Sequence, residues 1–241
     1  MAIPSPDLEA LRQLGERVRP LTAAGERTLA VPPALAGIFP QGGLQRGSIV
    51  ATGGLAATSL ALALAGPTTA SGAWMAVVGL PDLGLLAASE LGVALERTLL
   101  VADPGPQAWA ATVASLLDAV DVVLFRPASA IAPGIQRRLA ARARDRGSVL
   151  VQAGGRPTAW AQAPDLSVTA TAARWEGLAP GHGRLIARRV TVAVQGRRAA
   201  AQVRQVEVWL PGPDGRVAVA APVLPAPVVP VISDPVLREV G

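Results

Sequence analysis

A regular alternation of short apolar strands and helices between residues 47 and 152 constrains the fold more than any other feature. We expect strands at 48–52, 73–79, 98–102, 120–125 and 148–152, and helices at 55–65, 82–93, 106–119 and 133–146. Strands that are apolar throughout are typical of a parallel sheet whose two faces are both covered by helices. The sequence therefore predicts an α/β fold with a mostly parallel sheet and helices on both faces.

The pattern changes after residue 164, where β-like runs at 165–172, 184–194 and 201–210 follow one another without helices between them. A tight turn at 195–198 separates the last two runs, and another at 211–215 follows the third. Successive strands without helices predict an antiparallel C-terminal extension of the sheet. We divide the chain into an N-terminal helix and linker (1–36), a core (37–221) and a proline-rich tail (222–241).

The residue types that are missing exclude several kinds of chemistry. All the basic residues are arginine, so neither a P-loop lysine nor a Schiff base is available. The chain has no cysteine, and His182 is the only histidine. Thiolate nucleophiles, cysteine-ligated zinc and histidine-rich metal sites are therefore excluded. We expect no metal, no cofactor and no catalytic residue.

An uncharged segment at 48–81 raises the question of a membrane. Gly53-Gly54 and Gly66-Pro67 interrupt it, and the apolar helix between them is too short to span a bilayer. The first residues show no basic region followed by an apolar stretch. We expect a cytoplasmic protein that does not enter the membrane.

The residues around the first strand resemble the nucleotide site of RecA. Residues 38–50 (IFPQGGLQRGSIV) are similar to the lead-in to the RecA Walker A loop, and Gly53-Gly54 follows them. The loop is about two residues short, Ala57 stands at the lysine position, and Thr58 or Ser59 is left to offer a hydroxyl. The P-loop lysine neutralises the β- and γ-phosphates, so we expect this loop to bind a triphosphate poorly.

Two further positions of the RecA site have lost their acidic residues. Residues 120–126 (VDVVLFR) resemble the Walker B strand, and Arg126 replaces the aspartate of the magnesium shell. The strand at 73–80 resembles the one that leads into the RecA catalytic glutamate, yet no acid follows before Asp82. The resemblance spans residues 37–210 and implies a RecA-like core with a degenerate ATPase site. The segments 127–132 and 153–159 are too short to form the DNA-binding loops of RecA.

A small RecA-like protein with these losses resembles the ImuA family, in its actinobacterial form without Walker motifs. This resemblance implies a non-catalytic adaptor in DNA-damage-induced mutagenesis and translesion synthesis. The implied partners are ImuB, an inactive Y-family polymerase homologue, and an error-prone DnaE-type polymerase. Two alternatives remain open: a SulA-like cell-division inhibitor, and a DNA-binding modulator of RecA.

The net charge of +5 suits a nucleic-acid partner, and the arginines occur in two clusters. The first lies on the helix at 133–146, where Ile135, Leu139 and Ala143 form the buried stripe. Candidate DNA-binding residues are Arg137, Arg138, Arg142, Arg144 and Arg146 on this helix, and Arg188, Arg189, Arg197 and Arg198 in the second cluster. A solvated helix face explains the first cluster equally well. Trp160 and Trp175 are candidates for stacking on bases, although packing within the protein is an alternative for both.

The ends of the chain carry the candidate partner-binding residues. Residues 7–19 show helical spacing, with apolar positions at Leu8, Leu11, Leu14 and Val18. The tail holds prolines at 222, 225, 227, 230 and 235, and predicts an extended segment. Its candidate contact residues are Val229, Val231, Ile232, Val236 and Leu237. Such a segment suits addition to the edge of a partner's sheet, and a disordered tail is the alternative.

Overall fold

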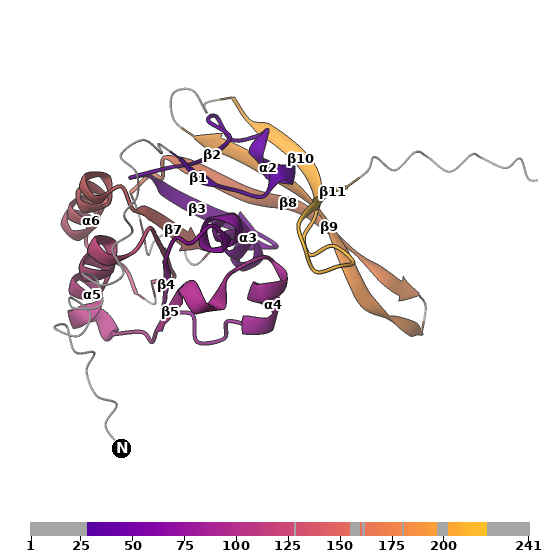
Figure 1. Ribbon diagram of the computed structural model, residues 1–241, viewed down its shortest axis with the longest axis horizontal. Helices are drawn as coiled ribbons and strands as arrows, with labels where there is room; N and C mark the ends of the chain where they lie inside the picture. Colours follow the sequence, from indigo (N-terminus) through magenta and orange to yellow (C-terminus); the bar gives the residue numbers. More distant parts are fainter. Residues whose placement is uncertain are drawn as a thin grey trace, which may run out of the picture.

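The computed structural model describes residues 28–127, 129–154, 160, 162–179, 181–196 and 202–220. Within these residues nine strands form one sheet in the order β11-β10-β9-β8-β3-β7-β6-β4-β5 (Figure 1). The strands from β8 to β5 in this order are parallel, and those from β8 to β11 are antiparallel. The predicted α/β fold, with a mostly parallel sheet and an antiparallel extension, is therefore confirmed.

The parallel strands arise from the apolar runs of the sequence. They are β3 (Ile49–Gly54), β4 (Met75–Val78), β5 (Thr98–Val101), β6 (Val122–Phe125) and β7 (Val149–Ala153). Every residue of β4, β6 and β7 is buried, because helices cover both faces of the sheet at these strands.

The helices divide between the two faces of the sheet. One face packs on α3 (Ala57–Ala70) and α4 (Leu85–Glu90), and the other on α5 (Gly105–Ala119) and α6 (Pro133–Arg146). Alternate residues of one strand enter different cores: Val122 and Leu124 face α3, whereas Val123 and Phe125 face α5 and α6. A short turn, η1 (Leu95–Arg97), leads into β5.

A small unit precedes the first parallel strand. Strand β1 (Thr28–Ala30) pairs with β2 (Gly43–Gln45), and α2 (Pro33–Ala36) lies between them in sequence. Leu29 and Leu35 of this unit are buried in the same core as α3. The sequence patterns do not predict these short elements, because each has too few residues to show a periodicity.

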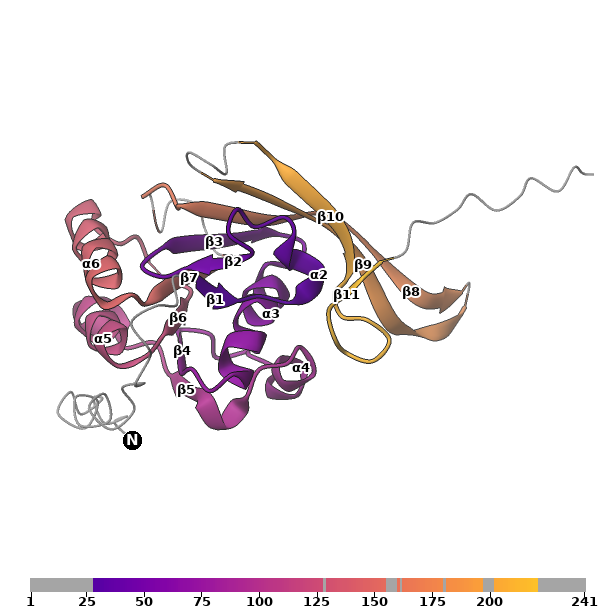
Figure 2. The same cartoon turned by 45° about the horizontal axis from the view of Figure 1, so that its top comes forward.

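The antiparallel strands are β8 (Leu166–Ala179), β9 (His182–Gly196), β10 (Arg204–Trp209) and β11 (Ala218–Val219). Strands β8 and β9 are longer than the sequence predicts. Pairing between β3 and β8 ends at Ala170, yet β8 continues with β9 as its partner. Residues 171–179 and 182–188 form a two-stranded projection that we call the arm (Figures 1 and 2).

Two helices differ from their predicted bounds by three residues or more. Helix α4 covers Leu85–Glu90 and not the predicted 82–93, because the backbone at Gly84 is extended and Gly92 has a φ of +94°. The expected end of α3 at Gly66-Pro67 is wrong, because the helix continues through both residues to Ala70. Proline removes one backbone donor, and Ser71 N still donates to Pro67 O at 3.0 Å. Gly66 is needed for packing, since a Cβ there would lie 2.7 Å from Leu91 O.

In the described ranges, no helix has the length and apolar character needed to cross a membrane. The predicted helix at 7–19 and the tail at 222–241 lie outside the described residues, together with the partner-binding residues assigned to them.

Candidate functional site

The candidate nucleotide site lies where β3 ends and α3 begins. Strand β3 runs to Gly54 and α3 starts at Ala57, so Leu55 and Ala56 alone connect them. A phosphate cradle needs a loop whose backbone N–H groups curl around the anion. A connection of this length leaves no such loop.

Gly53 and Gly54 belong to the strand and not to a phosphate-binding loop. Both pair with β8, and Gly54 has a φ of +78°. A Cβ at Gly54 would lie 2.1 Å from Ala170 O, which is far inside van der Waals contact. The close approach of β8 therefore explains why glycine is required at position 54.

Arg126, which the sequence resemblance aligns with the Walker B aspartate of RecA, reaches across the end of the sheet to α3. Its Nη2 donates to Thr58 Oγ1 at 2.6 Å, and its Nε donates to Ala153 O at 3.0 Å. It is half-buried, and within the described residues it forms no salt bridge with a carboxylate. The protein's own guanidinium thus binds the hydroxyl that a RecA-like site would present to magnesium.

A second arginine contacts the next residue of the same helix. Arg188 of β9 donates through Nη2 to Ser59 Oγ at 3.0 Å and through Nε to Leu210 O at 2.7 Å. Its guanidinium also lies over the Trp175 ring, 5.1 Å from the centroid. Burial lowers the pKa of Arg188 from its usual value. The first turn of α3 is therefore attached both to the centre of the sheet and to the base of the arm.

Ala57, at the position that the RecA resemblance gives to the lysine, is partly buried against the end of β7. Ala57 lies against Gly154, where a Cβ would be 3.1 Å from the Ala57 Cβ. Thr52 Oγ1 donates to Ala57 O at 2.8 Å and lies 3.1 Å from Gln152 O. Within the described ranges, no group of three histidine, aspartate or glutamate residues could hold a metal ion. The hydrogen bonds of Thr52 tie strands β3 and β7 to the first residue of α3.

The arginines of α6 are all exposed, and two of them are engaged by an acid. Arg142 and Arg146 both bind Asp118 of α5, with Nε–Oδ1 distances of 2.8 and 2.9 Å. Arg137 and Arg138 form no salt bridge within the described residues. The buried stripe of α6 includes Leu139 and Ala143 as predicted, and also Gln136 and Ala140.

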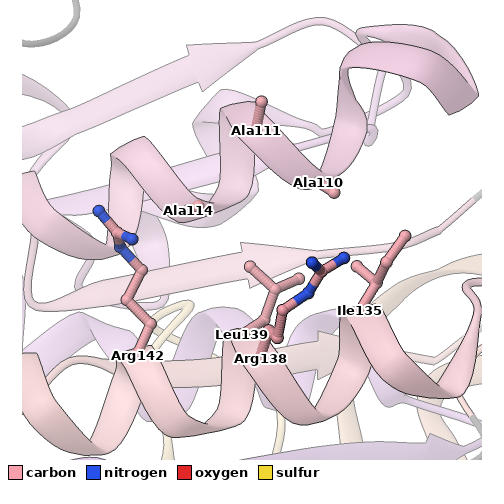
Figure 3. Close-up of a pocket in the computed structure, with 7 residues that line it drawn as sticks. All are labelled: Ala110, Ala111, Ala114, Ile135, Arg138, Leu139 and Arg142. Carbon is pink, nitrogen blue, oxygen red and sulfur yellow. The ribbon is translucent and has the colours of Figure 1, made fainter.

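A shallow groove of about 260 Å³ lies between α5 and α6 (Figure 3). Alanines of α5 and apolar side chains of α6 line it, and two arginines flank it. The lining residues are Ala110, Ala111, Ala114, Ile135, Arg138, Leu139 and Arg142. The groove therefore joins a small apolar surface to cationic side chains.

The two described arginines of the second cluster, Arg188 and Arg189, both contact other residues of the protein. Arg188 binds α3 as described, and Arg189 contacts Glu207 at 3.4 Å and lies over Trp209. Arg197 and Arg198 lie outside the described residues. Trp160 is buried against Trp109 and Phe125, so it is not available to stack on bases, whereas Trp175 is 38% exposed.

One buried ion pair is absent from the sequence predictions. Arg46 Nη1 binds Asp121 Oδ1 at 2.9 Å, and Trp74 N donates to the other carboxylate oxygen at 3.1 Å. Asp121 begins an otherwise apolar strand, and this position is the sequence signal for a buried carboxylate that needs a partner. This pair joins Arg46, which precedes β3, to the start of β6, whereas Arg126 follows the end of β6.

The structure defines a mixed α/β protein with a large, mostly parallel sheet and an antiparallel hairpin, in which two arginines bind the first turn of α3. The MT3502 N-terminal domain family matches residues 37–162, and the chain belongs to this family. The match includes the segment from Gly53 to Arg126 and ends before the arm. The uncharacterized protein Rv3395c of Mycobacterium tuberculosis is 34% identical over 151 residues, which cover 61% of this chain and 70% of that protein.

Proposed function

We propose that this protein is a RecA-like scaffold without ATPase activity, which acts as an adaptor in damage-induced translesion synthesis. The hydrogen bond from Arg126 to Thr58 is the observation that carries the non-catalytic part of the proposal. A cation at this position repels magnesium, and the β3–α3 connection is too short to surround phosphates. Its partner would be an inactive Y-family polymerase homologue, as the resemblance to the ImuA family suggests.

Measurements of nucleotide binding and hydrolysis distinguish a scaffold from a slow ATPase. Isothermal titration with Mg-ATP and a phosphate-release assay should show neither binding nor turnover, with RecA measured alongside as the positive control. The Arg126→Ala variant distinguishes two causes, because weak binding by that variant alone would mean that the guanidinium excludes the ligand. Hydrolysis by the purified wild-type protein would overturn the proposal.

The adaptor role requires a stable complex. Co-expression with the inactive polymerase homologue should yield a complex that survives purification, and the tail is the first segment to test. Val231→Asp and Ile232→Asp should each weaken the complex, and Ser233→Asp serves as a control that adds the same single charge in the same segment. Failure of the full-length pair to associate would refute the adaptor role and leave the nucleotide result untouched.

A second candidate function, a DNA-binding modulator of RecA, is favoured by the exposed arginines of α6. Arg137 and Arg138 have no acidic partner in the described part of the chain, so they are available to contact phosphates. Binding to single-stranded DNA should weaken steeply with salt, and Arg137→Ala with Arg138→Ala should reduce that salt dependence. Absence of binding at low salt would exclude this candidate.

A further inference from the structure

The outer edge of β8 along the arm is an open strand edge. Strand β3 pairs with β8 only as far as Ala170, and no other described strand lies on that side. The arm extends beyond the body of the fold in both views (Figures 1 and 2). An exposed edge with unpaired backbone groups is a ready template for another strand.

The register shows which groups of this edge point outward. Arg188 N donates to Pro211 O at 2.9 Å and Leu210 N donates to Arg188 O at 2.8 Å, so both backbone groups of Arg188 face β10. Trp175 lies directly opposite Arg188 in the hairpin. Residues that face each other in an antiparallel pair either exchange hydrogen bonds or both point away. The N–H and C=O of Trp175 therefore point outward, as do those of Ala173, and the regular register extends from Ala172 to Glu176.

Opposite charges flank the outward-pointing residue. Arg174 and Glu176 lie on either side of Trp175, share one face of the strand and are both exposed. In the described residues neither forms a salt bridge. In the β8–β9 pair Arg174 lies opposite another cation, Arg189, whose guanidinium forms a salt bridge with Glu207. A strand added at the open edge would bring its own side chains next to Arg174 and Glu176.

We propose that this edge pairs with the same edge of a second copy of the chain, antiparallel and centred on Trp175. A two-fold axis at Trp175 places Arg174 of each copy opposite Glu176 of the other, so the edge is complementary to itself. These pairs occupy non-hydrogen-bonded positions, where side chains come closest. Centring the axis on Arg174 or Glu176 instead would place like charges opposite each other, which is unfavourable.

The same register covers exposed apolar surface. Trp175 is 38% exposed and would lie beside its own copy across the axis. Joining the two arms would create a four-stranded sheet and satisfy the outward-pointing backbone groups of both.

Charge exchange tests the register directly. Sedimentation equilibrium of the full chain should show a monomer–dimer equilibrium. Arg174→Glu and Glu176→Arg should each raise the dissociation constant by about tenfold or more, because each places like charges opposite each other twice. The double variant, Arg174→Glu with Glu176→Arg, should dimerise like the wild type. A mixture of the two single variants should form a heterodimer, in which both charge pairs are restored.

Cross-linking provides a second measurement, since the chain has no cysteine of its own. Arg174→Cys mixed with Glu176→Cys should form a disulfide on oxidation, because these positions would have Cα atoms about 4.5 Å apart. Each variant alone should remain uncross-linked, since its two cysteines would not face each other. Circular dichroism should be unchanged in all variants, because both positions are exposed.

A monomer at every concentration would overturn the proposal and leave the edge free for a different protein. A dimer whose stability is unaffected by both single charge reversals would also overturn it, since another surface would then join the copies.

Discussion

Arg126 Nη2 lies 2.6 Å from Thr58 Oγ1, so the arginine that follows β6 is hydrogen-bonded to the first turn of α3. The two residues are separated by 68 positions in the chain. The hydrogen bonds of Arg126 to Thr58 and to Ala153 O give this arginine a structural role.

The role of Arg126 predicts a loss of stability on truncation. Arg126→Ala leaves Thr58 Oγ1 and Ala153 O without their donor, and it should lower the free energy of unfolding by about 1–3 kcal/mol. Urea denaturation followed by circular dichroism measures the change. Arg137→Ala, an exposed arginine without a salt bridge in the described residues, should change stability by less than about 0.5 kcal/mol. Equal effects of the two variants would contradict the structural role.

The close contact at Gly54 predicts a larger effect. Gly54→Ala combines an unfavourable positive φ with a Cβ 2.1 Å from Ala170 O, and it should cost at least about 1–3 kcal/mol. Gly134→Ala is the control, because it lies in α6 with nothing within 4 Å and no positive φ. That variant should be neutral or stabilising by up to about 1 kcal/mol. Thermal unfolding of the two proteins compares them directly.

The ion pairs of Asp118 predict a pH-dependent contribution to stability. Partial burial alone raises the pKa of Asp118, but hydrogen bonds and charges from Arg142 and Arg146 outweigh it and hold the pKa below its ordinary value of 3.8. The carboxylate therefore stabilises the fold above that value, and this contribution is lost as the pH falls through the lower, folded pKa.

Asp118→Asn should accordingly be less stable than the wild type by about 0.5–1 kcal/mol at neutral pH, since these pairs are partly exposed. The difference should shrink with added salt and disappear in strong acid. Denaturant titrations at several pH values measure it. A difference that stays constant down to the most acidic condition would show that packing, and not charge, is responsible.

The tryptophan cluster predicts which aromatic residue supports the core. Trp160 is 4% exposed and packs against Phe125 with ring centroids 5.1 Å apart. Trp160→Ala should cost about 3–5 kcal/mol, as for other large core truncations. Trp175→Ala, at the exposed base of the arm, should cost much less. Chemical denaturation of both variants tests the order, and a reversed order would contradict the packing described.

The sequence predicts the parallel part of the fold well because its signals are local. Apolar periodicity identifies the strands and helices of residues 47–153, and the predicted bounds of α6 agree with the structure. The substitutions at positions 57 and 126 are also visible in the sequence, since they follow from residue identity alone. Gly66 and Pro67 wrongly predict the end of α3, because the close packing of Gly66 against Leu91 is a tertiary contact that the sequence does not show.

What the sequence determined by itself is therefore the class of fold and the presence of alanine at position 57 and arginine at position 126. Only the tertiary structure decided the contacts of the arginines: Arg126 reaches Thr58, and Arg188 reaches Ser59 across 129 positions of the chain. The length of the arm was likewise decided by where β3 stops pairing with β8. Periodicity reports which face of an element is buried, whereas hydrogen bonds between distant residues depend on how the elements are brought together.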